Sequence, residues 1–266
     1  MCACWCDDGE GVRKLKLLKN QLRGFVSLLC FFTIIPVKRF YTLEETSLFS
    51  HLLPLLGLLT GGVFALSLFV TRGVFGDLIS SVLGVLCLGV LTGAHEVDGF
   101  MDFCDGLMCP GDASAKLSAM KDSALGVGGV FGGVVLLLIQ VGALSLLSQS
   151  LLVKAALSFE ILGKLSMVFL ARFSRPLSGS SSFPFSNALK GRQGALKLLF
   201  ASSLSVVLLF FLIGAERALI LFFACIIFTY FLSVTSNKLF GGANGDVFGA
   251  SNELVGTIAL LLILVS

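Results

Sequence analysis

The stretch DLISSVLGVLCLGVLTGAHEVDGFMDFCDG, residues Asp77–Gly106, joins two opposite kinds of sequence. Its first half, Asp77–Thr92, is apolar enough to lie in a lipid bilayer. Its second half crowds together the ionisable side chains His95, Glu96, Asp98, Asp102 and Asp105. Ionisable groups next to a membrane span are costly and usually functional. The stretch therefore predicts a membrane protein with a functional site at the end of a span.

The composition of the whole chain agrees with this interpretation. Of 266 residues, 56% are hydrophobic and 13% are charged, whereas a soluble domain carries about 25% charged residues. Most of the long apolar runs approach the roughly 20 residues that cross hydrocarbon as a helix. We expect a single-domain (1–266), all-α, polytopic membrane protein with about seven transmembrane helices. The runs are 47–71, 77–94, 127–153, 155–171, 197–214, 218–236 and 254–266.

The N-terminal region differs from these runs. The apolar segment Gly24–Val37 has only fourteen residues, follows a basic stretch and contains Pro36 near its end. No small-residue cleavage pattern follows it, so it does not read as a signal peptide. We predict one interfacial or re-entrant helix here. The cysteines at positions 2, 4 and 6 form no CxxC pair and indicate a reduced, frayed tail rather than a metal site.

The basic residues predict the orientation, because cytoplasmic loops of membrane proteins are enriched in Lys and Arg. If the N-terminus is cytoplasmic and Gly24–Val37 does not cross, fifteen basic residues fall on the cytoplasmic side and three outside. The acid-bearing loops His95–Asp122 and Lys238–Glu253 then both face the cytoplasm. We therefore predict a multi-pass protein of the cytoplasmic membrane with a cytoplasmic site.

Asp98, Asp102 and Asp105 are spaced by four and three residues, so on a helix they form one stripe. Such a stripe repels itself unless a cation compensates it, and Mg²⁺ prefers oxygen ligands together with substrate phosphates. Gly99 and Gly106 follow two of these acids and leave room for a phosphate or a neighbouring helix. The alternative, a solvated acidic loop, fits poorly because apolar residues separate the acids.

Two further segments carry similar residues. NKLFGGANGDVFGASNELVG (237–256) places Asp246 and Glu253 among glycines, and exposed backbone N–H groups of such loops suit phosphate. KLSAMKDSALGVGG (116–129) adds Asp122, with Lys116 and Lys121 either neutralising phosphate or anchoring the loop at the membrane surface. Together these features predict Mg²⁺-dependent transfer of a phosphate-linked group. No basic domain suggests nucleic-acid binding.

Three blocks resemble cobalamin synthase, the adenosylcobinamide-GDP ribazoletransferase family. They are LTGAHEVDGFMDFCDG, MKDSALGVGG and GGANGDVFGASNE, which occur in the family's order. FTIIPV, PLLG and FEILGKLSM are also similar to family members, so the resemblance covers most of the chain. It implies that α-ribazole, or its 5′-phosphate, attacks the phosphorus attached to cobinamide in adenosylcobinamide-GDP. GMP leaves, and adenosylcobalamin or its 5′-phosphate forms.

The chain departs from the family pattern at two positions. Asn244 stands where the family has Thr, and Glu96 stands where the family has His, with His95 one place earlier. On a helix His95 lies about 60° from the aspartate stripe and Glu96 about 160° from Asp98. An imidazole also suits a general base at cytoplasmic pH. We therefore expect His95 to handle the proton or orient the ribazole hydroxyl, with Glu96 supporting it.

The residue patterns and the resemblance together predict the site. The candidate catalytic residues are His95, Glu96 and Asp98; the candidate Mg²⁺ ligands are Asp98, Asp102, Asp105, Asp122 and Asp246; and the candidate substrate contacts are Glu253, Asn244, Gly99, Gly106, Lys116, Lys121, Gly242 and Gly245.

The expected partners are the two substrates and the lipid bilayer, while a homo-oligomer or a complex with other cobamide-synthesis enzymes stays open. Two rival functions are a CDP-alcohol-type lipid phosphotransferase, whose full signature is absent, and an ion-coupled transporter. A transporter would hold its acids near mid-span, where the sequence offers only the pair Glu160 and Lys164.

Overall fold

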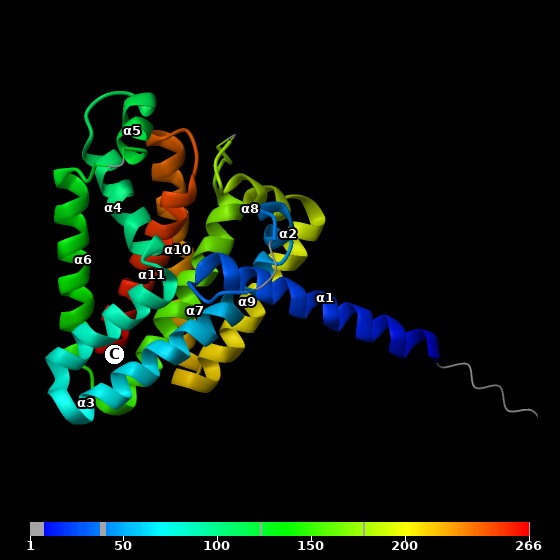
Figure 1. Ribbon diagram of the computed structural model, residues 1–266, viewed down its shortest axis with the longest axis horizontal. Helices are drawn as coiled ribbons and strands as arrows, with labels where there is room; N and C mark the ends of the chain where they lie inside the picture. Colours follow the sequence, from blue (N-terminus) through cyan, green and yellow to red (C-terminus); the bar gives the residue numbers. More distant parts are fainter. Residues whose placement is uncertain (1–7, 38–40, 123, 178, 266) are drawn as a thin grey trace, which may run out of the picture.

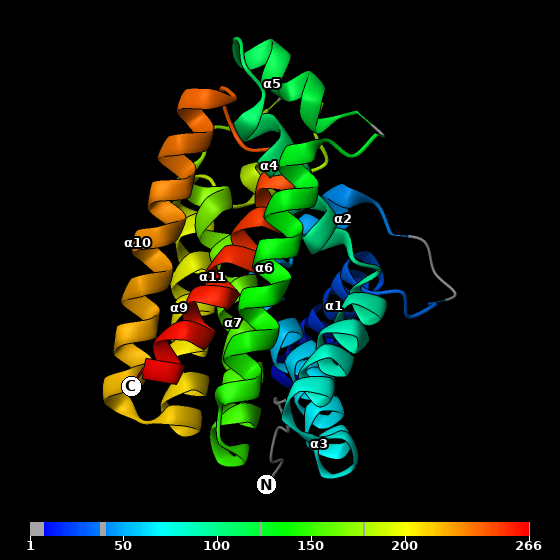
Figure 2. The same ribbon diagram turned by 90° about the vertical axis from the view of Figure 1, so that its left-hand side faces the viewer.

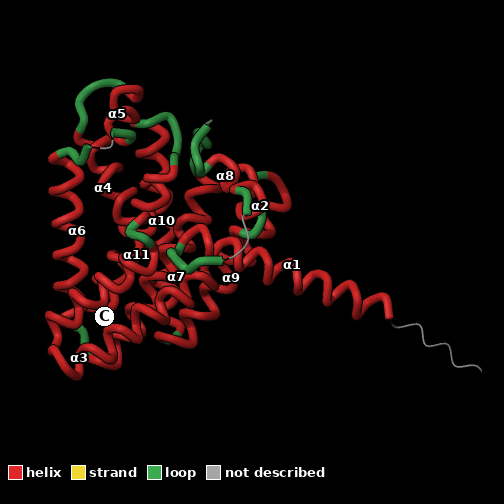
Figure 3. Tube along the Cα trace, viewed as in Figure 1, coloured by secondary structure: helices red, strands yellow, loops and turns green. Residues whose placement is uncertain are grey.

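The computed structural model describes residues 8–37, 41–122, 124–177 and 179–265, with side chains from residue 15 onward. These residues form helices joined by short loops, and none of them forms a strand (Figures 1 and 3). In chain order the elements are α1 (Asp8–Phe32), α2 (Leu43–Ser47), the 3-10 helix η1 (Ser50–Leu52), α3 (Leu53–Thr92), α4 (His95–Met108), α5 (Ala113–Met120), α6 (Val127–Leu146), α7 (Gln149–Phe173), α8 (Phe183–Ala188), α9 (Gly191–Ile213), α10 (Ala215–Leu239) and α11 (Gly245–Val265).

Five helical segments of the described chain are long and apolar enough to cross a bilayer. This confirms the predicted all-α polytopic membrane fold, while the number of crossings stays a prediction. The segments are Ser50–Thr92, Val127–Leu146, Gly191–Ile213, Ala215–Leu239 and Gly245–Val265.

The longest segment contains a turn. Gly76 in α3 has φ 73°, a left-handed conformation that residues with a Cβ rarely adopt. The arms on either side of this turn pack together. Gly84 in the second arm lies so close to the Leu68 side chain in the first that a Cβ at position 84 would collide with it. Two adjacent predicted runs, 47–71 and 77–94, therefore correspond to two arms of one continuous helical element.

The N-terminal helix is longer than predicted. Instead of a short element within Gly24–Val37, one helix runs from Asp8 to Phe32 and includes the basic stretch. Figure 1 shows α1 projecting away from the other helices, and only its C-terminal part packs against them. The cysteines at positions 2, 4 and 6 and the pair Lys38–Arg39 lie outside the described residues.

Helix α7 is the centre of the bundle and packs against α3, α9, α10 and α11. Nearly all its residues from Ala155 to Ala171 are buried. Small residues allow the close approach: the backbone of α7 at Glu160 lies directly against Gly57 of α3. On the other side, a Cβ on Gly163 would lie 2.6 Å from Asn252 Oδ1 of α11. The core helix thus carries two charged residues, Glu160 and Lys164, into the protein interior.

The last helix corrects one boundary. The sequence predicted a loop over Lys238–Glu253 and a span over 254–266, but α11 begins at Gly245. Asp246 therefore lies in its first turn, and Glu253 lies two turns inside a candidate span. These polar residues lower the local hydropathy, yet Glu253 is buried among other helices and Asp246 is half-buried at the beginning of the helix.

The connections separate into two ends of the molecule. Figure 2 shows α5 and the α10–α11 connection at one end, and the turn of α3 and the C-terminus at the other. The acid-bearing helix α4 and the beginning of α11 are near the first end. This grouping agrees with the predicted topology, while the cytoplasmic side stays a prediction.

Candidate active site

The site is built where α4 crosses the first turns of α11. A Cβ on Gly99 would lie 3.1 Å from both Asp246 Cα and Asp246 O, and one on Gly249 would lie 2.9 Å from Glu96 O. The two backbones therefore touch, and larger side chains would force them apart. Gly99 was predicted as a substrate contact, but in the structure it packs helix against helix.

This crossing gathers three aspartates from two segments far apart in the sequence. Asp98 and Asp102 lie on α4 beside Asp246 of α11, close enough for their charges to interact. Burial, and then the charges of Asp246, Asp98 and Asp105, raise the pKa of the Asp102 carboxyl from 3.8 to about 6. The rise shows that burial and the neighbouring acids both disfavour the ionised form of Asp102.

Asn244 holds Asp246 in place. Its Nδ2 donates a hydrogen bond to Asp246 Oδ2 at 2.7 Å, and its Oδ1 accepts one from the Val247 N–H at 3.2 Å. The second bond caps the N-terminus of α11. Asn244 thus orients an acid of the cluster, a role that an amide fills well in place of the family's Thr.

Asp105 occupies a different environment. Its two oxygens accept backbone N–H bonds from Gly126 (2.9 Å) and Gly129 (2.8 Å) at the beginning of α6. A Cβ on either glycine would collide with the carboxylate. Asp105 therefore fixes α6 against α4. It shares a second cavity, of about 370 Å³, with Asp122, which is exposed and accepts the Ala124 N–H.

The other predicted phosphate contacts are mostly occupied within the protein. Lys116 Nζ donates to the carbonyls of Gly106, Leu107 and Cys109 at the C-terminus of α4. Gly106 packs against α5, and Gly242 packs against the Arg175 carbonyl. Lys121 is exposed, and its charge acts on Asp246. Of the two lysines, Lys121 is the one free to meet a phosphate beside the acidic cluster.

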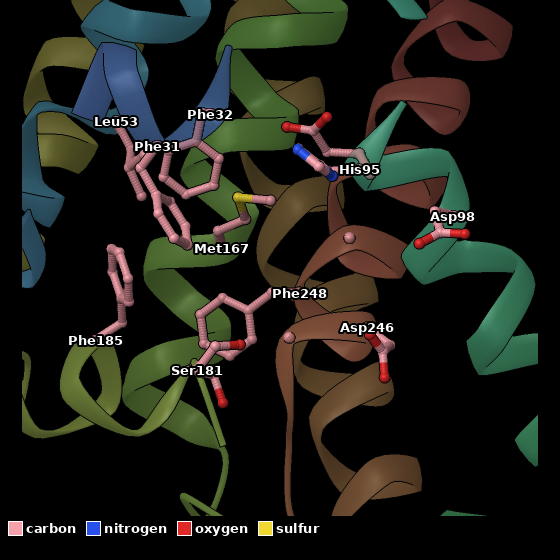
Figure 4. Close-up of a pocket in the computed structure, with 14 residues that line it drawn as sticks. Phe31, Phe32, Leu53, His95, Asp98, Met167, Ser181, Phe185, Asp246 and Phe248 are labelled. Atoms are coloured by element: carbon pink, nitrogen blue, oxygen red, sulfur yellow. The ribbon is translucent and has the colours of Figure 1, made fainter. Parts of the chain in front are cut away.

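A cavity of about 290 Å³ opens beside the cluster (Figure 4). His95, Glu96, Asp98 and Asp246 line one part of it, together with Gly245. The remaining lining residues are Phe31, Phe32, Leu53, Met167, Ser181, Ser182, Phe185, Phe248 and Gly249. None of these aromatic residues was predicted from the sequence to belong to the site. Their spacing gives no signal of a shared wall, because they come from α1, α8 and α11.

His95 and Glu96 both reach this cavity but in different ways. His95 is exposed, whereas Glu96 is only 4% exposed and its Oε1 accepts a hydrogen bond from Lys164 Nζ at 2.8 Å. The second oxygen, Oε2, is buried without a hydrogen-bond partner. Sequence reasoning placed Glu96 off the aspartate stripe but did not identify Lys164 as its partner.

Lys164 belongs to a polar network beneath the cavity. Its Nζ lies 3.6 Å from Glu160 Oε2, which confirms the predicted pair, and 3.1 Å from Asn252 Oδ1. Glu253 accepts a hydrogen bond from Gln140 Nε2 at 2.7 Å deeper in the bundle. Glu253 lines none of the cavities described here, so the structure separates it from the aspartate cluster.

The arrangement suits a cation without showing one preformed cage. Among the described residues, no three His, Cys, Asp or Glu side chains converge closely enough to hold an ion between them. Asp98, Asp102 and Asp246 nevertheless lie close enough for the charges of Asp98 and Asp246 to act on Asp102. Oxygen donors of this kind fit Mg²⁺, which keeps waters and completes its shell with substrate phosphates. The ligand roles predicted above stay predictions.

Comparison with known proteins agrees over nearly the whole chain. Residues 24–264 match the family model described as cobalamin-5-phosphate synthase. Three relatives named adenosylcobinamide-GDP ribazoletransferase come from Thermococcus kodakarensis, Caldanaerobacter subterraneus subsp. tengcongensis and Clostridium kluyveri. They are 32%, 28% and 28% identical, over 88%, 91% and 93% of this chain and 96%, 98% and 98% of their own. No solved structure matches. The chain, whose first and third motif blocks meet at the α4–α11 crossing, belongs to the cobalamin-5-phosphate synthase family.

Proposed function

We propose that this protein is an adenosylcobinamide-GDP ribazoletransferase. A hydroxyl oxygen of α-ribazole, or of its 5′-phosphate, forms a bond to the phosphorus attached to cobinamide. The bond from that phosphorus to the GMP oxygen breaks, and the hydroxyl proton is released. The family match and the names of the relatives support this assignment. The observation that carries it is the meeting of Asp98, Asp102 and Asp246. Together these carboxylates can hold the cation that neutralises the charge of a diphosphate substrate.

Mg²⁺ is the cation that this proposal requires. Asp98, Asp102 and Asp246 would hold it, with Asp105 and Asp122 at the adjoining second cavity. When bound, it would neutralise charge on the diphosphate and on the departing GMP. The exposed Lys121 would add a positive charge on the same side.

His95 is the proposed proton acceptor. Its exposed imidazole lines the cavity next to Asp98. A neutral imidazole can accept the hydroxyl proton as the new bond to phosphorus forms. Glu96 is less suited to that step, because one oxygen is already bound to the Lys164 ammonium.

The orientation and partners follow from the same proposal. The site faces the cytoplasm, since the basic residues favour that side and GDP-linked intermediates are cytoplasmic. The bilayer surrounds the apolar helices. Homo-oligomers and complexes with other cobamide-synthesis enzymes are not required by the chemistry.

The test uses the purified full chain in detergent with two substrate pairs. We expect adenosylcobinamide-GDP and α-ribazole to give adenosylcobalamin and GMP in equal amounts. A CDP-alcohol lipid donor with a lipid or polyol acceptor should give no CMP. Asp246→Asn should lose the reaction, whereas Asp112→Asn, an exposed cap of α5, should retain it. CMP release without GMP release would replace the proposal by the lipid phosphotransferase alternative.

A further inference from the structure

The cavity beside the aspartates has two chemically different ends. Figure 4 shows Phe31, Phe32 and Phe185 on one side and His95, Asp98 and Asp246 on the other. The three rings contact one another, with the Phe185 centroid 5.8 Å from Phe31 and 6.2 Å from Phe32. The aromatic end therefore comes from two helices, α1 and α8, that the sequence separates by 150 residues.

Most of this apolar wall is buried in the protein, although Phe31 at its edge is 40% exposed. Phe185 is 4% exposed, Met167 is 3% exposed and Phe248 is 8% exposed. Lipid therefore does not account for their composition. At about 290 Å³ the cavity is at the lower limit for small-molecule sites. It has room for one small ring system and its sugar, and not for a corrin macrocycle.

We propose that the aromatic end binds the dimethylbenzimidazole ring of α-ribazole; the inference rests on the reaction proposed above. A methylated, planar, largely apolar ring matches a wall of phenylalanines and a methionine, which favour offset or edge contacts with aromatic ligands. The guanine of the other substrate would bury several N–H and carbonyl groups there without partners. Of the lining serines, Ser182 already donates to the Ala243 carbonyl, and Ser181 lies by Gly245 at the acidic end.

The position of Glu96 supports the same orientation. Glu96 lines the cavity, and its buried Oε2 lacks a hydrogen-bond donor while Lys164 holds Oε1. A buried acceptor without a partner is unfavourable. A ribosyl hydroxyl of the bound nucleoside satisfies it. When the benzimidazole ring of the nucleoside lies against Phe185, its sugar faces Asp98 and Asp246. The phosphorus of the second substrate must lie beside these two acids.

The experiment measures binding of α-ribazole alone to the detergent-purified protein by equilibrium dialysis. Phe185→Leu and the more exposed Phe31→Leu remove one ring each and should raise Kd about five- to tenfold, the value of one aromatic contact. Phe173→Leu is the matched control: this ring stacks on Phe169, outside the cavity, and its loss should leave Kd unchanged. In turnover, the two cavity variants should raise KM for α-ribazole and not for adenosylcobinamide-GDP.

The outcomes separate this inference from the proposed reaction. Unchanged α-ribazole affinity in folded Phe185→Leu and Phe31→Leu would overturn the inference, even if the wild type releases GMP. A raised KM for adenosylcobinamide-GDP instead would assign the cavity to the other substrate. Ring-dependent binding of α-ribazole in a wild-type protein that releases no GMP would keep the inference and reject the proposed reaction.

Discussion

Asp102→Asn is expected to abolish turnover and yet make the metal-free protein more stable. The folded protein raises the pKa of Asp102 from 3.8 to about 6, through burial and the neighbouring aspartates. This rise corresponds to about 3 kcal/mol of unfavourable charge at neutral pH. Because the side chain is only half-buried, solvent screening reduces the effect to about 1 kcal/mol.

The sign follows from proton binding. The folded protein holds the Asp102 proton more tightly than the unfolded chain does, so stability is lost as the pH rises through about 6. Asparagine carries no charge and avoids this loss. In detergent with EDTA at pH 7.5, the variant should therefore unfold about 2–4 °C higher than wild type. Below about pH 3.8, where Asp102 is protonated in the folded and in the unfolded chain alike, the difference should vanish.

Asp105→Asn is the matched control, with the opposite expected sign. Its carboxylate accepts backbone N–H bonds from Gly126 and Gly129, so its replacement should lower the unfolding temperature. Thermal unfolding with and without Mg²⁺ measures both variants, and Mg²⁺ should stabilise wild type more than Asp102→Asn. If Asp102→Asn lowers the unfolding temperature in EDTA as Asp105→Asn does, the reasoning about uncompensated charge is refuted.

Three other predictions concern the residues around the cluster. Lys164→Met should destabilise the protein by about 3–5 kcal/mol, because Glu96 then lies buried without its cation. The double variant Lys164→Met/Glu96→Gln should recover part of this stability. If the two substitutions instead destabilise the protein additively, the pairing of Glu96 with Lys164 is contradicted. Gly99→Leu should abolish turnover while the helical content persists, because a side chain there meets Asp246 backbone atoms 3.1 Å away; normal activity would mean that the α4–α11 crossing does not form the site. His95→Ala should lower kcat, whereas Glu96→Gln should retain it. The reverse result, with activity lost only in Glu96→Gln, would move the proton chemistry to Glu96.

Part of the fold could be predicted from the apolar runs and from the spacing of charged residues in the sequence. Apolar runs predicted the five candidate spans, whereas the run 155–171 lies in α7, which is not one of them. The spacing of Asp98, Asp102 and Asp105 predicted the helix now described as α4. The start of α11 was missed because hydropathy alone treats Asp246 and Glu253 as loop residues. In the structure Asn244, just before the helix, binds Asp246, and Gln140 of α6 binds Glu253. The basic N-terminal stretch was likewise separated from the apolar run that continues its helix.

The site could be predicted only in its charged half. Three acids on one helix and an Asp among glycines carry a local signal, so Asp102 and Asp246 could be proposed together. The partnership of Glu96 with Lys164, 68 residues away, depends on how α4 and α7 pack. The aromatic wall depends on α1 and α8 meeting beside that pair. Glycine roles were also ambiguous, since Gly99 allows a helix rather than a phosphate to approach.

The most direct test of the account is GMP release by the purified protein, measured with each component omitted in turn. The account predicts release from adenosylcobinamide-GDP only when α-ribazole and Mg²⁺ are both present, and complete loss in EDTA that added Mg²⁺ restores. Asp98→Asn and Asp246→Asn should show no such recovery. GMP release that persists in EDTA, or that proceeds at the same rate without α-ribazole, would contradict a cation-dependent transfer at the α4–α11 crossing.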